Sequence, residues 1–256
     1  MLKLRNIQLK KKDGTLTTID DMKIYLNEMS LSVMASTLDE QINDPNIGLK
    51  TADERIVELI TNEYLSRYAN KIAKGLKKSH MKYPGAEYGD LIVDETRELD
   101  KDSLDRLMTC KFIDEKKNLV ITGPCGCGKT WIASCIGVRA LTQLRSVRYC
   151  STSRLIAELK MKEEDNTYLK ALDQIAKLDL LILDDIGLMN LDIHSCRIFF
   201  EVLDSRDQNG SVIFISQYPI SKWFSLFENA TYADAALSRA TGKAYRLDVK
   251  GKDYRR

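Results

Sequence analysis

The chain has 256 residues, of which 44% are hydrophobic and 30% charged, and its formal net charge is +2 at pH 7. By the rule of roughly 100 to 200 residues per domain, this length predicts one large α/β domain with a smaller appendage. The composition is that of an ordinary globular protein and excludes a disordered or fibrous chain. The net charge is too small to indicate a polyanionic partner by itself, so any nucleic-acid contact must depend on local basic patches.

Neither a membrane segment nor a metal site built from cysteine is expected. No apolar stretch approaches the ~18 residues that cross a bilayer, and segment 1–12 lacks the apolar block of a signal peptide. We therefore expect a cytoplasmic protein with no membrane partner. The six cysteines form no CxxC pair and have no zinc-type spacing with the two histidines, so we expect reduced thiols that bind no metal.

The first hundred residues predict a small all-helical domain. Apolar residues recur at helical spacing in 22–33 and again in 56–76. The second run begins with a capping box, in which the Thr51 hydroxyl and the Glu54 carboxylate each satisfy a free backbone N–H group. Basic residues surround its apolar stripe: Arg67, Lys71, Lys74, Lys77 and Lys78. Two interpretations stay open, a bundle core with a solvated basic face or a face that docks DNA or protein.

A break in the helical pattern marks the expected domain boundary. Tyr83, Pro84 and Gly85 interrupt the periodicity, and the chain stays rich in turns for the next fifteen or so residues. We therefore divide the chain into a helical domain, 1–100, that makes partner or oligomer contacts, and a second domain, 101–256.

Strand, loop and helix alternate through the second domain, which predicts a parallel sheet with crossover helices. The expected strands are 119–122, 147–150, 180–183, 212–216 and 245–249. The expected helices are a short one from Ser103 and others at about 129–144, 153–176, 194–206 and 221–240. Five strands wrapped by helices make a three-layer α/β domain of the P-loop type.

One segment matches the phosphate-binding pattern GxxxxGK[ST], and it follows an apolar strand and precedes a helix, as that pattern requires. Its residues are Gly123, Pro124, Cys125, Gly126, Cys127, Gly128, Lys129 and Thr130. The glycines let successive backbone N–H groups point at phosphate oxygens, beside the positive end of the following helix. We expect Lys129 to bridge the β- and γ-phosphates of ATP and Thr130 to hold Mg²⁺. Cys125 and Cys127 contribute backbone amides, and a redox role for their thiols stays open.

The apolar strand 180–183 is followed by two carboxylates, Asp184 and Asp185. A strand with only apolar residues is buried on both faces of a parallel sheet, so its terminal acids emerge beside the P-loop. We expect Asp184 to hold the Mg²⁺ shell through water, and Asp185 to polarise the attacking water as general base.

The strand 212–216 also ends in polar side chains, Ser216 and then Gln217. In this order of motifs, that position can sense the γ-phosphate or the attacking water, and we favour Gln217 over Ser216. The alternative is a strand that ends in ordinary turn residues.

Taken together, the motifs resemble those of the IstB-like ATP-binding proteins, which are insertion-sequence transposition helpers related to the DnaC helicase loaders within the AAA+ ATPases. The resemblance covers nearly the whole chain. Its motifs are Tyr83-Pro84, Thr-Gly-Pro-x-Gly-x-Gly-Lys-Thr at 122–130, Leu-Asp-Asp-Ile-Gly at 183–187, Ile-Ser-Gln-Tyr-Pro at 215–219, Trp223, Leu-Ser-Arg at 237–239 and Lys-Gly-Lys-Asp-Tyr-Arg at 250–255. The P-loop alone indicates only a nucleotide-binding protein, whereas the later motifs in this order are far more specific.

The resemblance implies an oligomeric ATPase that assembles on DNA and hydrolyses ATP at its subunit interfaces. Arg239 falls where the family places an arginine finger that reaches the neighbour's nucleotide, and a surface ion pair is the alternative. Such a finger is worth roughly a thousandfold or more in rate. The implied catalytic residues are Lys129, Asp185, Gln217 and Arg239.

The chain departs from the family at some positions. Asp185 stands where many members have Glu, and Gln217 stands where many have Asn. Asp is one methylene shorter than Glu, so the attacking water has to be displaced to match. Seven residues follow Val249, too few for the helical lid of many AAA+ proteins, and we expect no C-terminal lid domain.

DNA contacts are expected from helices inserted after the second strand, where related initiator ATPases touch DNA. The candidates are Arg154, Lys160, Lys162 and Lys170. Phosphate contacts by such side chains are independent of base sequence and sensitive to salt. A solvated helix face is the alternative, and the basic residues in 1–12 form a second candidate surface.

The sequence therefore predicts an AAA+ ATPase that uses ATP and Mg²⁺, multimerises on duplex DNA and assists or regulates a partner transposase. A DnaC-like replicative helicase loader, whose helical domain grips the helicase, is the first alternative. A nucleotide-dependent scaffold with little turnover is the second.

Overall fold

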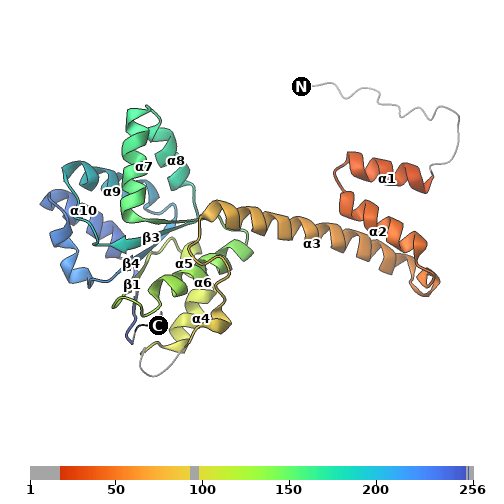
Figure 1. The fold of residues 1–256 in the computed structure, drawn as a ribbon, viewed down its shortest axis with the longest axis horizontal. Coiled ribbons are helices and arrows are strands. Elements are labelled where there is room, and N and C mark those ends of the chain that lie inside the picture. Colours follow the sequence, from red (N-terminus) through yellow and green to blue (C-terminus); the bar gives the residue numbers. More distant parts are fainter. Residues whose placement is uncertain (1–17, 93–97, 252, 254–256) are drawn as a thin grey trace. The chain divides into compact units, whose positions relative to one another are not determined.

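The computed structural model describes residues 18–92, 98–251 and 253. The chain divides into two compact units, Met1–Asn70 and Lys71–Arg256 (Figure 1). The basic segment 1–12, a candidate anionic-partner surface, lies outside the described residues.

The N-terminal unit is helical. α1 (Ile19–Glu28) begins with a capping box, in which the Asp21 amide donates to the Thr18 hydroxyl at 3.2 Å. Ser30 has a φ of 60°, which reverses the chain before α2 (Ser32–Asn43). The first apolar run of the sequence therefore spans two helices.

A carboxylate from α3 (Ala52–Ser79) caps the start of α2. Glu63 accepts hydrogen bonds from the amides of Val33 and Met34, each at 3.0 Å. The residue at the N-cap position itself, Leu31, has no polar side chain to do this. The free N–H groups of α2 are thus satisfied by another helix, which fixes how α2 packs on α3.

The start of α3 agrees with the predicted capping box, and a short 3₁₀ turn, η1 (Ile47–Leu49), precedes it. The Thr51 amide donates to the Glu54 carboxylate at 2.7 Å, and the Glu54 amide donates to the Thr51 hydroxyl at 3.3 Å. The apolar stripe that follows is not a bundle core in this unit, because Ile56 and Ile60 are 53% and 55% exposed. Its use as a docking face stays a prediction.

The second unit contains a five-stranded parallel sheet in the order β2-β3-β4-β1-β5. The strands are β1 (Leu119–Thr122), β2 (Val147–Ser151), β3 (Leu180–Ile186), β4 (Ser211–Ser216) and β5 (Tyr245–Asp248). The predicted parallel sheet is confirmed. β3 runs three residues further than expected, because its pairing with β4 resumes at Ile186 after a register shift that begins at Leu183.

Helices cover both faces of this sheet. They are α4 (Lys101–Met108), α5 (Lys111–Asp114), α6 (Lys129–Thr142), α7 (Thr152–Glu164), α8 (Tyr168–Ala176), α9 (Ile193–Arg206) and α10 (Ala230–Thr241), with 3₁₀ turns η2 (Tyr88–Asp90), η4 (Ile220–Lys222) and η5 (Phe224–Leu226). The expected helix 153–176 is two helices, since Asn166 has a φ of 54°. The expected helix 221–240 begins only at Ala230, where the Asn229 side chain caps it.

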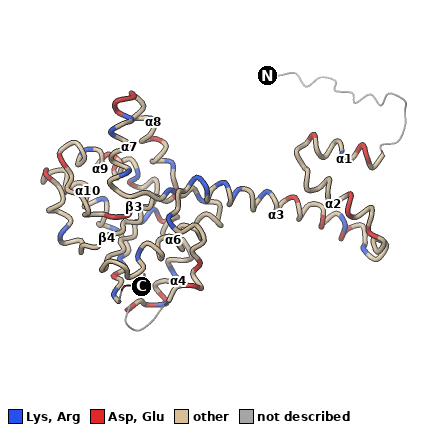
Figure 2. The backbone as a smooth tube through the Cα atoms, viewed as in Figure 1, with Lys and Arg blue, Asp and Glu red and all other residues tan. Residues whose placement is uncertain are grey.

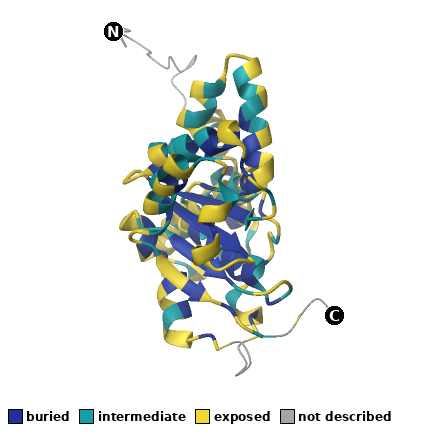
Figure 3. Cartoon of the chain, turned by 90° about the vertical axis from the view of Figure 1, so that its left-hand side faces the viewer, coloured by how far each residue is buried: buried dark blue, intermediate teal, exposed yellow. Residues whose placement is uncertain are grey.

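Side chains alternate along the strands between two buried clusters, so the domain has three layers, as expected. Ile182 of β3 lies in the cluster under α4 and α6, whereas its neighbours Leu181 and Leu183 lie in the cluster under α7, α9 and α10. Figure 3 shows the strands buried between exposed helix surfaces.

The segment before α4 packs on the sheet domain. Met81, Ala86 and Leu91 are buried in the same cluster as α6. A Cβ on Gly137 of α6 would lie 2.4 Å from Cε of Met81, so this glycine makes room for the segment. Residues 71–92, which the sequence-based boundary at 100 assigned to the helical domain, belong to the same compact unit as the sheet.

No helix in the described ranges is long and apolar enough to span a bilayer.

Candidate nucleotide-binding site

The turn from β1 into α6 requires three glycines. Gly123, Gly126 and Gly128 have φ of 145°, 79° and 89°, a region that L residues rarely adopt. A Cβ on Gly123 would lie 2.0 Å from the carbonyl oxygen of Val249, just beyond β5. The loop is thus confined beside the end of β5, and a loop of this curvature gathers backbone N–H groups into an anion-binding nest.

Lys129 closes the loop from within. Its side chain is buried, and Nζ donates to the carbonyl oxygens of Gly123 and Pro124, both at 2.7 Å. Buried ammonium groups need acceptors, and these carbonyls hold the charge inside the loop. Phosphate oxygens would be alternative acceptors at the same place.

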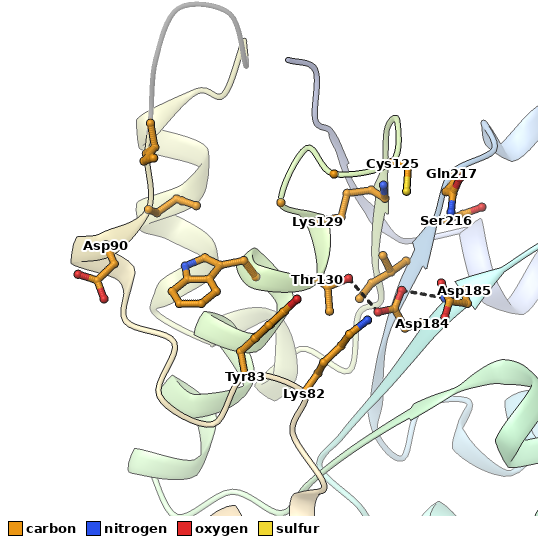
Figure 4. A pocket seen from close by; sticks show the side chains of 16 residues that line it. Lys82, Tyr83, Asp90, Cys125, Lys129, Thr130, Asp184, Asp185, Ser216 and Gln217 are labelled. Carbon is orange, nitrogen blue, oxygen red and sulfur yellow. Dashed lines mark hydrogen bonds between the residues drawn. The ribbon is translucent and has the colours of Figure 1, made fainter. Parts of the chain in front are cut away.

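Asp184 joins three elements at one buried carboxylate (Figure 4). The Thr130 hydroxyl at the start of α6 donates to Oδ2 at 2.9 Å, and the Tyr149 hydroxyl of β2 donates to the same oxygen at 2.7 Å. The backbone amide of Asp185 donates to Oδ1 at 2.8 Å. The structure therefore brings together the two predicted metal ligands, Thr130 and Asp184.

Tyr149 is a member of this site that the sequence did not reveal. Burial, and then the neighbouring charge of Asp184, raise the pKa of its phenol well above the ordinary value, so it stays a hydrogen-bond donor. Tyr149 lies on β2, which pairs with the strand of Asp184 in the sheet. The spacing of motifs along the chain does not indicate which strands are neighbours, so it could not predict this contact.

Asp185 differs from its neighbour in backbone and environment. Its φ of 62° turns the chain at the end of β3, and its side chain is half-buried in the cavity wall. Burial, and then the charge of Asp184, raise the pKa of this carboxyl above its ordinary value, and the charges of Lys82 and Lys129 oppose that rise. A carboxylate of raised basicity is suited to accept a proton.

At the end of β4, the two polar residues have separate roles. Ser216 is buried, and its hydroxyl donates to the carbonyl oxygen of Ile186 at 2.7 Å, so it links β4 to β3. Gln217 is exposed and lines the same cavity as Asp184 and Asp185. The side chain with freedom to contact a ligand is therefore Gln217.

These residues line one cavity of about 390 Å³, a size that suits a nucleotide. Its wall also includes residues outside every motif to which the sequence assigned chemistry: Lys82, Tyr83, Asp90, Leu91, Ile92 and Trp131. The rings of Tyr83 and Trp131 pack at a centroid distance of 5.3 Å. The Tyr83-Pro84 break and the position of Trp131 directly after Thr130 were the only sequence signals for this wall.

The donor set fits Mg²⁺ only in part. Thr130 and Asp184 offer the hard oxygen atoms that Mg²⁺ prefers. Within the described part of the chain, no group of three or more His, Cys, Asp or Glu side chains could hold a metal ion. This suits an ion that takes its remaining ligands from phosphate and water, as Mg²⁺ does with nucleotides.

Arg239 lies away from the cavity in its own chain. It projects from α10, forms an ion pair with Asp204 at 2.7 Å and lies over the ring of Phe200, with 4.7 Å from the guanidinium carbon to the ring centroid. It is therefore not brought together with the P-loop of its own chain.

The DNA candidates lie on α7 and α8, outside the cavity. Arg154 and Lys170 are exposed, whereas Lys160 and Lys162 are half-buried. Lys160 forms an ion pair with Asp192 at 3.2 Å, so part of its charge is already compensated. Figure 2 shows acidic residues beside the basic ones at the end of α7.

Comparison with known proteins agrees with this geometry. The sequence model of the family described as IstB-like ATP binding protein matches residues 24–256. The chain belongs to this family. It is 34% identical over 231 residues to an insertion sequence ATP-binding protein of Sinorhizobium fredii, with 90% of this chain and 94% of the relative covered. An insertion sequence IS1162 ATP-binding protein of Pseudomonas fluorescens is 35% identical over 196 residues, with 77% and 85% covered.

Solved structures show the fold of this IstB-like protein. The DnaC helicase loader aligns with a TM-score of 0.55 at 20% identity, covering 66% of this chain and 99% of the loader. AMPPCP-bound DnaA from Aquifex aeolicus aligns with a TM-score of 0.56 at 18% identity, covering 67% of this chain and 52% of DnaA. The sheet domain therefore has the fold of the AAA+ domains, as the sequence predicted.

Proposed function

We propose that this protein is a Mg²⁺-dependent ATPase that multimerises on duplex DNA and assists a partner transposase in insertion-sequence transposition. The observation that carries the proposal is the Thr130–Asp184 hydrogen bond inside a cavity that the P-loop, Asp185 and Gln217 also line. Membership of a family of insertion-sequence ATP-binding proteins supports the choice of transposition.

In the proposed reaction, backbone amides of the P-loop and the Lys129 ammonium bind the β- and γ-phosphates. Thr130 and Asp184 would hold Mg²⁺, which supplies charge neutralisation at the transferring phosphoryl group. Gln217 orients a water, and Asp185 accepts its proton as the water oxygen bonds to the γ-phosphorus. The bond from that phosphorus to the bridging oxygen breaks, and ADP and phosphate leave.

Assembly on DNA completes the site in this proposal. Arg239 reaches the nucleotide of a neighbouring subunit, and neutralising the phosphoryl charge there is worth roughly a thousandfold in rate. A structurally similar DnaA is bound to AMPPCP and single-stranded DNA, which supports a nucleotide-dependent DNA complex. Arg154 and Lys170, both exposed, are the strongest candidates for sequence-independent phosphate contacts.

A helicase loader is the alternative, and the fold shared with the DnaC loader is the observation that favours it. In that case the N-terminal unit, with its exposed apolar stripe on α3, would bind a replicative helicase. The two functions share the ATPase site and differ only in the partner.

The test combines turnover, imaging and partner capture. We expect ATP hydrolysis that duplex DNA stimulates, that Lys129→Ala abolishes, and that accompanies multimers on DNA in negative-stain images with a non-hydrolysable ATP analogue. Hydrolysis near background that is indifferent to DNA and to Asp185→Asn would point to a scaffold. Capture of a replicative helicase, but not of an insertion-sequence transposase, would favour the loader.

A further inference from the structure

Lys82 occupies a place in the cavity wall where the backbone is fixed on both sides. Met81 before it is buried against Gly137 of α6, and the Tyr83 ring after it packs on Trp131. The Lys82 side chain itself is exposed and lines the nucleotide cavity. The fold therefore holds the base of this side chain in place and leaves its charged end facing the cavity.

The charged end of Lys82 points at the carboxylate pair. Figure 4 shows its ammonium directed towards Asp184, on the side of the cavity where Asp185 also lies. The charge of Lys82 lowers the pKa of Asp185, ahead of the contribution from Lys129. Two lysines thus act on this carboxylate, one from the P-loop and one from the segment that precedes the sheet.

The two lysines are engaged differently. The Lys129 ammonium donates to two loop carbonyls at 2.7 Å. No ion pair involves Lys82 among residues 18–92, 98–251 and 253, although ten other lysines and arginines there form one. The Lys82 ammonium, which faces the cavity without an ion pair to any described residue, is thus available to attract a further anion.

We propose that Lys82 is a second phosphate-binding cation, which contacts the terminal phosphate of ATP and so distinguishes ATP from ADP. The proposal rests on the proposed function in one respect, that the cavity binds ATP. The terminal phosphate adds negative charge beside Asp184 and Asp185, and a cation on the carboxylate side offsets this repulsion. An ordinary solvated lysine at this place would not discriminate between the two nucleotides.

The test measures affinity for two ligands by titration calorimetry with Mg²⁺ present, using ADP and the non-hydrolysable methylene analogue of ATP. Lys82→Met should weaken binding of the ATP analogue by roughly ten- to hundredfold, the range of a charge-assisted hydrogen bond. The dissociation constant of ADP should change by less than about threefold. Lys82→Arg, which keeps the charge, should retain most of the affinity for the ATP analogue.

Lys78→Met is the matched control, since it removes the same charge from an exposed lysine that does not line the cavity. The proposal would be overturned if Lys82→Met lost the same factor of affinity for ADP and for the ATP analogue, or lost affinity for neither. A second readout is competition, because ADP should displace the ATP analogue at a lower concentration ratio from Lys82→Met than from Lys78→Met. If the unmodified protein binds neither ligand, the proposed ATPase function fails instead.

Discussion

Two neighbouring carboxylates at the end of β3 are prepared for different chemistry by what surrounds them. Asp184 is buried and accepts hydrogen bonds from Thr130, Tyr149 and a backbone amide, so its oxygens are fixed in place. Asp185 is half-buried, and its pKa is raised by burial and by Asp184. The first environment suits a positioning ligand and the second suits a proton acceptor.

Asp185→Asn should separate activity from stability. Loss of a general base typically lowers the rate by roughly 10²- to 10⁴-fold. The pKa of Asp185 is higher in the folded state than in the unfolded state. Its favourable contribution to the free energy of unfolding is therefore present below the unfolded-state pKa and is lost as the pH rises through the folded-state pKa. Asn carries no charge to bury, so we expect a melting temperature at pH 7 equal to or above that of the unmodified protein.

Thermal melting and steady-state hydrolysis, each measured from pH 4 to pH 8, check this prediction. The stability difference between Asp185→Asn and the unmodified protein should grow in favour of Asn as the pH rises through the acid range. A variant that is inactive because it melts earlier at pH 7 would contradict the assigned role.

Tyr149→Phe tests whether the orientation of Asp184 matters for Mg²⁺. The phenol donates to the carboxylate at 2.7 Å, and removing the donor keeps the ring in place. Loss of one such hydrogen bond costs about 1 kcal/mol, so we expect a several-fold increase in the Mg²⁺ concentration that half-saturates hydrolysis. Tyr245→Phe is the control, since that exposed hydroxyl donates to Glu115 at 3.2 Å, away from the cavity.

At the scale of elements, the corner between β1 and α6 depends on the absence of a side chain. Gly123→Ala would place a Cβ 2.0 Å from the Val249 carbonyl oxygen and force φ of 145° on an L residue. Backbone strain of this kind costs of the order of 1–3 kcal/mol before the steric clash is added. We expect a lower melting temperature and loss of nucleotide binding, measured by thermal melting and by calorimetry.

Gly85→Ala is the matched control for this change. Nothing lies within 4 Å of a Cβ built on Gly85, and its φ is not in the left-handed region. An unchanged melting temperature in Gly123→Ala would mean that β5 does not confine the loop.

The elements that sequence predicted best are those that local pattern defines. The apolar run 119–122 lies between a charged turn and a glycine, and β1 has those bounds. The helix expected over 153–176 is divided at Asn166, whose positive φ no apolar spacing reveals. β3 extends through the Asp pair because a register shift there lets pairing with β4 resume at Ile186, and such a shift is a property of two strands.

In the candidate site, too, the residues defined by a local sequence pattern were predicted best. The P-loop and Asp184 were predicted from spacing along the chain, and the structure brings Thr130 and Asp184 together. Lys82 escaped prediction because it reaches the cavity only when the segment before α4 packs on α6. Trp131 lies on α6 itself, but its packing partner Tyr83 comes from that segment. The catalytic roles of Asp185, Gln217 and Arg239 stay predictions.

At the scale of the whole molecule, the question is whether one chain contains a complete site. Arg239 pairs with Asp204 on the surface of its own subunit, and the cavity is lined without it. An ion pair at this exposure contributes about 0.2–1 kcal/mol to the free energy of unfolding. The ion pair alone therefore gives only a weak reason for an arginine at this position. A finger that serves the neighbouring subunit would be a stronger one.

The variants Arg239→Ala and Asp204→Asn separate these two roles, since each breaks the same ion pair but only the first removes the guanidinium. If Arg239 acts on a neighbour, Arg239→Ala should lower DNA-stimulated hydrolysis by roughly a thousandfold, with nucleotide affinity unchanged. Asp204→Asn should hydrolyse ATP normally. Similar losses in both variants would mean that the ion pair, and with it the packing of α10 on α9, is what hydrolysis requires.

Mixing two inactive variants then tests whether the site is shared. Lys129→Ala lacks a working P-loop and keeps Arg239, whereas Arg239→Ala keeps its P-loop and lacks the finger. A mixed assembly on DNA contains interfaces where an intact P-loop meets an intact Arg239, so up to about a quarter of the unmodified rate should return at equal mixing, in proportion to those interfaces. Lys129→Ala mixed with Asp185→Asn is the control, because both changes affect the same half of the site and no interface regains all of its parts. Hydrolysis that stays at background in the first mixture, although both variants join the same multimer, would place the whole reaction within one subunit and leave Arg239 as the surface ion pair that its contacts with Asp204 and Phe200 describe.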